Sequence, residues 1–198
     1  VNFTDEEMVE LHYASMLHDV GKIGVREHIL TKANKLFPGQ EEAVRLRSKL
    51  IESAIRENAL QEIARLLSKP EESGGVDEIG AAEKARDAAI SQLRSDTDFV
   101  FLVNKPGFMN DQQVARLEEV RKRIHPVSGG MPNQLLTEEE YKSLSVRKGS
   151  LNEEERKEIE SHVVKSRIFL EQIPWTRELA GVPQIAGQHH EKMNSKGY

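Results

Sequence analysis

The sequence predicts an all-α protein, and two observations support this fold class. Aromatic residues make up 5% of the 198 residues and charged residues 31%, a balance that favours helices with long solvated faces over a β-sandwich. Apolar residues recur at helical spacing through most of the chain, and turns that contain glycine or proline separate these segments. The length suits one domain, or one domain with an insertion.

The first predicted helix begins at a capping box, in which the Thr4 hydroxyl is followed three residues later by a carboxylate. Apolar residues at helical spacing extend this helix to His18. Gly21 and Gly24 then interrupt the pattern, and residues 25–30 are expected to form a short second helix.

Two long amphipathic stretches follow, at residues 40–68 and 77–94. Residues 69–75 contain one proline and two glycines and are predicted to form a turn. Two helices joined by such a turn favour an antiparallel hairpin. The apolar run at residues 99–103 could be a strand or a buried helical segment, because its spacing does not distinguish them.

Four further helical segments are expected in the second half of the chain. One covers the amphipathic residues 111–124. Two begin at Thr137 and Asn152, which are each followed by a run of glutamates, and the second of these is expected to end at Pro174. The last is predicted over residues 182–192.

The net charge and the cysteine content limit the kinds of partner and of metal site that the chain can have. The formal net charge of -5 argues against a DNA or RNA polymer as partner, although a small phosphate ester fits because a bound metal reverses the local field. The absence of cysteine excludes disulfides and thiolate metal sites and leaves histidine and carboxylate ligands. No apolar stretch is long enough to span a membrane and no signal peptide is present, so the expected compartment is cytoplasmic.

The pair His18-Asp19 is the first candidate for metal chemistry. An imidazole and a carboxylate at a helix end can both reach one divalent ion, and an aspartate can also bridge two metals. Lys22 brings a positive charge toward the same place and could neutralise a phosphate oxygen. Taken alone, such a pair is more often found at the surface.

The pair His189-His190, followed by Glu191, is the second candidate. Adjacent residues in a helix point about 100° apart, so these imidazoles would address different ions. His162 lies on the apolar side of its helix, where the ordinary interpretation is a hydrogen-bonded core histidine. Together with the other two groups, an inward-facing neutral imidazole becomes a candidate ligand.

Three histidines are not expected to be ligands. Two are interpreted as surface residues and the third lies within an apparent insertion: His12, His28 and His125.

Two segments resemble the signatures of a known family. Residues 17–25 (LHDVGKIGV) resemble the HDxGK signature of the HD superfamily in the form used by the HD-GYP subfamily. Residues 189–198 (HHEKMNSKGY) resemble its HHExxDGxGYP signature, and residues 148–155 followed by His162 resemble the segment that supplies a third ligand region. The chain is therefore similar to the HD-GYP cyclic di-GMP phosphodiesterases.

The resemblance covers residues 1–36 and 149–198 and implies an HD-domain helical bundle with a long helical insertion at residues 37–148. It implies hydrolysis of cyclic di-GMP to linear pGpG or GMP by a metal-activated water, with two or three divalent transition-metal ions, most often iron or manganese, as cofactors. The residues that match metal ligands are His18, Asp19, His162, His189 and His190. Asp19 and Lys22 match catalytic residues, with Lys22 on the phosphate, and Gly197-Tyr198 match the GYP loop that shapes the site and is associated with partner contacts.

The sequence also departs from the family pattern. Asn194 and Ser195 stand where the family usually has Asp-Gly. The chain begins directly on a helix start and stops at Tyr198, and a ligand histidine upstream and an aspartate ligand downstream fall outside it, so we expect a domain that is incomplete at both ends. Two alternatives stay open: a degenerate module that binds nucleotide or a partner protein without turnover, and an HD phosphohydrolase for another nucleotide.

The insertion has two interpretations. It is either a helical hairpin that packs on its own domain or on a second copy, or a signalling lever or dimer arm. Leftover apolar surface on its helices would favour a homodimer through the insertion.

Overall fold

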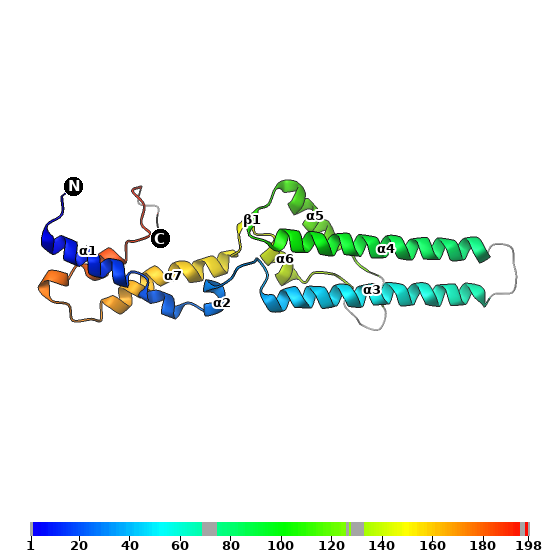
Figure 1. The fold of residues 1–198 in the computed structure, drawn as a ribbon, viewed down its shortest axis with the longest axis horizontal. Coiled ribbons are helices and arrows are strands. Elements are labelled where there is room, and N and C mark those ends of the chain that lie inside the picture. The colour runs from blue at the N-terminus through cyan, green and yellow to red at the C-terminus, as the bar shows by residue number, and fades with distance from the viewer. Residues whose placement is uncertain (1, 69–74, 126, 128–132, 195–196, 198) are drawn as a thin grey trace. The chain divides into compact units, whose positions relative to one another are not determined.

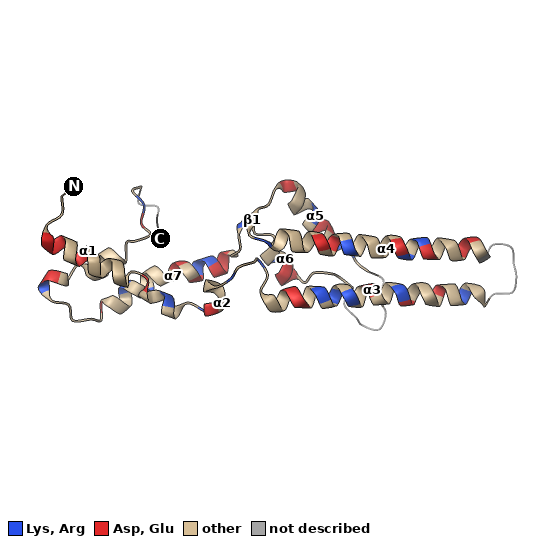
Figure 2. Ribbon diagram, viewed as in Figure 1, with Lys and Arg blue, Asp and Glu red and all other residues tan. Residues whose placement is uncertain are grey.

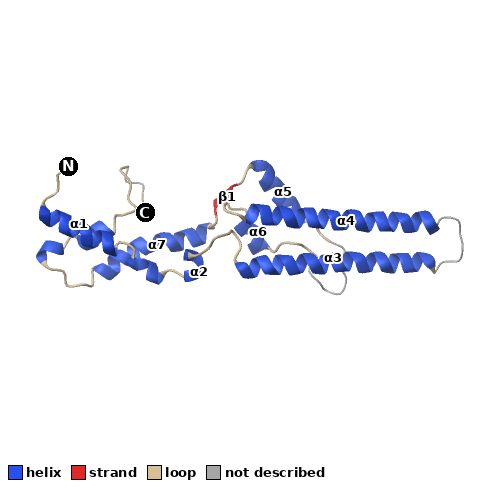
Figure 3. Ribbon diagram, in the orientation of Figure 1, coloured by secondary structure: helices blue, strands red, loops and turns tan. Residues whose placement is uncertain are grey.

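The computed structural model describes residues 2–68, 75–125, 127, 133–194 and 197. It confirms the all-α fold class, with a single two-stranded ladder among the described residues (Figure 3). The elements in chain order are α1 (Asp5–Leu17), η1 (Val20–Gly24), α2 (Glu27–Leu30), α3 (Pro38–Leu67), α4 (Gly75–Asn104), β1 (Gly107–Phe108), α5 (Asp111–Lys122), α6 (Glu138–Leu144), β2 (Lys148–Gly149), α7 (Glu153–Leu170), η2 (Arg177–Leu179) and α8 (Val182–Ala186). Here η denotes a 3₁₀ helix.

The chain divides into two compact units. The split unit consists of Val1–Lys32 and Leu151–Tyr198, and the central unit consists of Ala33–Ser150. The assignment of residues 37–148 as an insertion into a catalytic domain stays a prediction.

Helices α3 and α4 of the central unit run antiparallel and pack side by side (Figure 1). The turn predicted between them lies almost entirely outside the described residues. Helix α4 extends to Asn104 and therefore contains residues 99–103, where Phe99, Val100 and Val103 are buried, so this run is a buried helical segment. Acidic and basic residues are interspersed along both helices, as expected for solvated faces (Figure 2).

Apolar side chains from α3, α4, α5 and α6 form one large core in the central unit. Its buried members are Leu36, Val44, Ile51, Ile55, Ile90, Leu93, Phe99, Val100, Val103, Met109, Leu117, Val120, Leu135, Leu136 and Leu144. The short ladder of β1 and β2, which the sequence does not predict, pairs Gly107 with Gly149 and Phe108 with Lys148. Gly149 has a φ of 86°, a conformation that favours glycine.

The split unit contains α1, η1, α2, α7, η2 and α8. Its buried apolar cluster is small and consists of Ala14, Leu170, Val182 and Ala186, with Trp175 among the partly buried side chains around it. The indole Nε1 of Trp175 donates to the carbonyl of Leu170 at 2.8 Å, which ties the end of α7 to the loop that follows it.

Two helix ends differ from the prediction. Helix α7 ends at Leu170, before Pro174, and α8 ends at Ala186 although the pattern continued to residue 192. Gly187 follows α8, and glycine is unfavourable in a helix interior. His189 and His190 therefore lie in a turn, and the angular argument that assumed a helix does not apply to them. No described helix combines the length and the apolar character needed to cross a membrane.

Candidate metal centre

Helix α7 is the scaffold of the candidate centre. The carboxylate of Glu155, in its first turn, accepts hydrogen bonds from the buried Lys32 Nζ at 2.7 and 2.8 Å. One turn later, Glu158 accepts hydrogen bonds from both the Nε and the Nη2 of Arg26. These two ion pairs hold η1 and α2 against one face of α7.

The next two turns of this face carry His162 and Ser166. The Ser166 hydroxyl oxygen accepts a hydrogen bond from the Gly21 amide at 2.8 Å, and both residues are buried. Asp19 lies two residues before Gly21, and its Oδ1 lies 3.3 Å from the Nε2 of His162. The fold thus brings together residues that are more than 140 positions apart in the sequence.

The two carboxylate oxygens of Asp19 face different neighbours. Oδ1 lies 3.3 Å from the Nε2 of His162 and 3.8 Å from the Nε2 of His189. Oδ2 lies 3.1 Å from the Nε2 of His18 and accepts a hydrogen bond from the Nζ of Lys22 at 2.7 Å. One carboxylate therefore stands between two sets of nitrogen atoms, as a bridging ligand requires.

Three histidines of the cluster have the same orienting contact. In each, Nδ1 lies close to the backbone carbonyl oxygen three residues earlier, at 2.6 Å for His18, 2.5 Å for His162 and 2.6 Å for His189. A carbonyl oxygen only accepts hydrogen bonds, so Nδ1 carries the proton and Nε2 of the neutral ring has a free lone pair. Such a contact behind the ring is typical of metal-binding histidines.

The lone pairs converge. The Nε2 atoms of His162 and His189 lie 3.2 Å apart, and the ring centroids of His189 and His190 lie 4.4 Å apart. Two groups of three residues each offer ligand atoms within 4.8 Å of one another: His162, His189 and His190, and His18, Asp19 and His189. Nitrogen lone pairs that face one another repel unless a cation lies between them, and imidazole with carboxylate suits divalent transition metals. The residues present therefore fit a centre of this kind.

The electrostatics of the cluster favour, for two residues, the protonation state in which the side chain can bind a metal. Burial raises the pKa of Asp19, but the hydrogen bond from Lys22 and the electrostatic interactions with His18, Lys22 and His162 outweigh it and lower the pKa below its usual value. Burial lowers the pKa of His190, as do the nearby His189 and His162, and this outweighs the opposite effect of Asp19. At neutral pH Asp19 is ionised and His190 is neutral.

The structure therefore brings four of the predicted residues, His18, Lys22, His162 and His189, into contact with Asp19 and places His190 beside them. Gly197, from the second signature, donates its amide to Glu191 Oε1 at 2.7 Å, and a Cβ at this glycine would lie 2.4 Å from the carbonyl oxygen of His190. Tyr198 and Ser195 lie outside the described residues. His12 and His28 are exposed, as expected.

His125 belongs to the central unit and is a member of neither ligand group. It is buried, and this burial lowers the pKa of its imidazole. Its backbone amide donates to the carbonyl of Asn133 at 2.7 Å.

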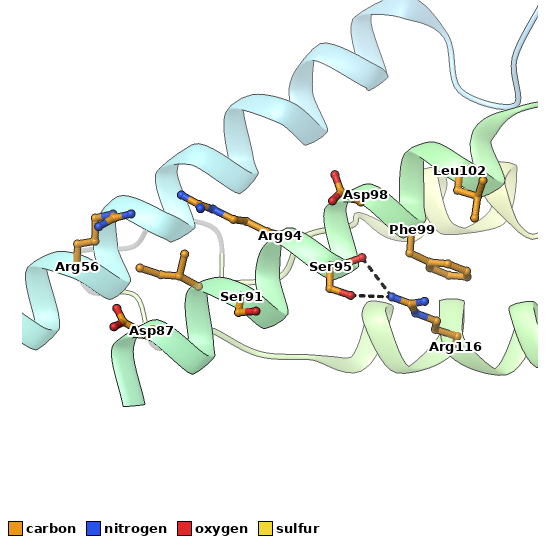
Figure 4. Close-up of a pocket in the computed structure, with 10 residues that line it drawn as sticks. Arg56, Asp87, Ser91, Arg94, Ser95, Asp98, Phe99, Leu102 and Arg116 are labelled. Atoms are coloured by element: carbon orange, nitrogen blue, oxygen red, sulfur yellow. Dashed lines mark hydrogen bonds between the residues drawn. The ribbon is translucent and has the colours of Figure 1, made fainter. Parts of the chain in front are cut away.

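A hollow of about 860 Å³ also lies in the central unit, and no histidine lines it (Figure 4). Its arginines are engaged within the unit: Arg56 and Arg94 both donate to Glu52, and Arg116 lies over the ring of Phe99 at 4.2 Å. A smaller hollow of about 520 Å³ lies between α1 and α8 and is lined by His18 and His189 themselves. Candidate metal ligands line the smaller hollow and not the larger one.

Some residues that build the centre were not singled out from the sequence. Ser166 and the ion pair of Lys32 with Glu155 position the HDxGK segment. The one available signal was a serine on the inward face of α7, one turn after His162. The partners of these residues lie far away in the sequence, so no local pattern identifies them.

Comparison with known proteins gives one match. Residues 134–198 match the family model described as HD domain, which covers about a third of the chain. The matched segment contains His162, His189 and His190 but not His18-Asp19. No curated protein and no solved structure matches the chain. HD domains form a superfamily of metal-dependent hydrolases, and residues 134–198 are similar to a domain of this family.

Proposed function

We propose that the chain is the catalytic part of a metal-dependent phosphodiesterase of the HD-GYP type that hydrolyses cyclic di-GMP. The observation that carries the proposal is the convergence of three imidazole Nε2 atoms on the two oxygens of Asp19. The two signatures, at residues 17–25 and 189–198, supply the substrate expectation, and the HD domain match supports the class of reaction.

Each residue of the cluster has a role in this proposal. Asp19, ionised at neutral pH, would be shared by two ions, with His18, His162, His189 and His190 as the remaining ligands within the described residues. When bound, such ions polarise a phosphoryl oxygen and lower the pKa of a water molecule. The metals would be iron or manganese, as the resemblance implies.

Lys22 would place its ammonium on the substrate phosphate. Its side chain is 44% exposed, so it can leave Asp19 and turn toward a ligand. A compact cation of this kind stabilises the charge that develops on a phosphate during in-line displacement. The hollow beside His18 and His189 would receive part of the nucleotide. Gly197 and Tyr198 would shape the neighbouring loop and contact a partner.

For the central unit, we propose an insertion that contributes no metal ligand. Its apolar core lies wholly within the unit. The prediction of a homodimer has the support of four leucines on α3 whose exposed fractions are about half or more: Leu46, Leu50, Leu60 and Leu67.

Turnover of cyclic di-GMP tests the proposal. The chain, freed of metal and then supplied with Mn²⁺ or Fe²⁺, is expected to convert cyclic di-GMP to pGpG or GMP, with products separated by chromatography. Asp19→Ala should reduce the rate to the uncatalysed background and lower the bound metal, because both oxygens of the bridge are lost. His12→Ala is the matched control on the preceding helix α1, and His125→Ala is the control in the central unit; neither should change the metal content.

Other outcomes distinguish the alternatives. Binding of cyclic di-GMP without products would favour the degenerate module, for which Asn194 in place of the usual aspartate is the supporting observation. Turnover of a different member of a nucleotide panel would favour an HD phosphohydrolase with another substrate. Equal metal loss in the Asp19 and His125 variants would contradict the site assignment.

A further inference from the structure

We propose that Ser166 is a positioning residue: its hydroxyl sets the position of Asp19 against α7 and thereby the metal affinity of the ligand group that contains His18 and Asp19. The inference rests on the proposed function, because it assumes that the cluster binds metal. Three observations carry it, concerning the approach of two backbones, one buried hydrogen bond and the division of the ligands into two groups.

The backbone of η1 lies directly against that of α7. A Cβ built on Gly21 would lie 2.2 Å from the carbonyl oxygen of His162 and 2.4 Å from the amide nitrogen of Ser166. Real Cβ atoms do not approach other atoms this closely, so only glycine permits the contact. Gly21 is two residues after Asp19, and the atom it touches belongs to His162 itself. The separation of these two candidate ligands is therefore set at this contact.

One hydrogen bond holds the contact closed. The Gly21 amide donates to the Oγ of Ser166 at 2.8 Å, and the Ser166 side chain is fully buried. A serine hydroxyl inside a helix commonly bonds to the backbone of its own helix. Here the oxygen accepts from a different element instead. Removing it would leave a buried amide without this partner, and such a group is costly unless η1 moves away from α7 or water enters.

The two ligand groups should respond differently to a movement of η1 away from α7. The group of His18, Asp19 and His189 depends on the segment that Gly21 anchors, whereas the group of His162, His189 and His190 contains no residue of that segment. A shift of η1 should therefore weaken the binding of an ion at the first group, which loses the position of two ligands, more than at the second. Residues that support a metal ligand from behind typically change the metal affinity by about 10- to 100-fold when they are replaced.

A role in packing alone predicts something different. Serine and alanine differ by one oxygen atom, so Ser166→Ala leaves the buried space nearly filled. If Ser166 only stabilised the helix contact, its loss would lower the stability of the unit and affect both ions alike. The ratio of the two metal affinities distinguishes positioning from packing.

The test is a calorimetric titration of the metal-free full chain with Mn²⁺, without nucleotide, at fixed pH. Wild type should show two classes of site. Ser166→Ala should weaken one class by about 10- to 100-fold and change the other less. Ser161→Ala is the matched control, because Ser161 directly precedes His162 but bonds to the Glu158 carbonyl of its own helix at 2.6 Å. This control should titrate like wild type.

Ser166→Gly also removes the hydroxyl and serves as a second variant, with far-UV circular dichroism as the check on folding. Equal weakening of both classes, or no change in either, would overturn the positioning role, as would loss of the folded state in both Ser166 variants. If wild type binds no Mn²⁺, the proposed function fails together with this inference. If wild type binds metal and turns over cyclic di-GMP while Ser166→Ala titrates unchanged, this inference fails alone.

Discussion

The two units of this chain are stabilised in different ways. The central unit buries 15 apolar residues in one cluster, whereas the buried apolar cluster in the described part of the split unit has four members, two of which are alanines. The split unit also relies on polar contacts between α7 and the segment of η1 and α2, including one buried ion pair and one buried serine. The central unit adds the largely buried ion pair of Arg47 with Glu140 to a large apolar core, whereas the split unit depends mainly on specific polar partners.

The difference bears on function. A unit with a small apolar core can keep histidines and a carboxylate close together at the cost of stability, since facing lone pairs and buried polar groups oppose folding. A cation bound by the cluster would offset this cost. We therefore expect the split unit to be the metal-dependent part of the fold and the central unit to be independent of metal.

The largest expected effect is a selective stabilisation by metal. Trp175 is the one tryptophan of the chain and lies in the split unit, so its fluorescence reports that unit, while far-UV circular dichroism is dominated by the helices of both. Mn²⁺ at about 100 times its Kd should raise the free energy of unfolding seen by Trp175 by about 2.7 kcal/mol. Urea titrations with and without metal measure this. An equal rise in the free energy of unfolding of the central unit would contradict the expectation that only the split unit depends on metal.

A pair of glycine substitutions should have opposite signs in the two units. Gly21→Ala forces a Cβ into the backbone of α7 and should destabilise the split unit by about 1–3 kcal/mol or more, with loss of metal affinity. Gly80→Ala, inside α4, meets nothing within 4 Å and should stabilise the central unit by about 0.5–1 kcal/mol. Urea unfolding followed by Trp175 fluorescence and by circular dichroism gives both values. Stabilisation by Gly21→Ala would refute the close backbone contact.

The smallest effect concerns an ion-pair network of the central unit. Hydrogen bonds from Arg94 and Arg56 lower the pKa of Glu52 from 4.5 to about 2. A lowered pKa means that the stabilisation is fully present above pH 4.5 and is lost as the pH falls toward 2. Because both arginines are more than half exposed, water screens the pairs and the contribution is modest.

Glu52→Gln should therefore be less stable than wild type at pH 7, and the difference should shrink as the pH falls from 4.5 toward 2. Urea unfolding at pH 7, 5 and 3, followed by circular dichroism, checks this. Glu57→Gln is the control on the same helix, because Glu57 contacts the neutral Gln61 and its replacement removes no such pair. The same pH dependence in both variants would contradict the assignment to Glu52.

Local sequence patterns predicted the helix starts well. Thr4, Thr137 and Asn152 each cap a helix through a capping box, as expected, because the hydrogen bonds involved span only three residues. Helix ends were less predictable. Helix α4 continues ten residues past its predicted end and α8 stops six residues early, since packing against other elements, and not spacing alone, decides how far a helix continues.

The sequence by itself determined the all-α class, the helix starts and the set of residues able to bind a metal, because these follow from local periodicity, capping and the two signature segments. Only the tertiary structure decided which of those residues meet. It oriented three imidazoles through backbone carbonyls, turned the two oxygens of Asp19 toward different neighbours, and placed Ser166 on the Gly21 amide. These contacts join residues on separate elements, and their geometry depends on how closely two backbones approach, which spacing along one chain does not encode.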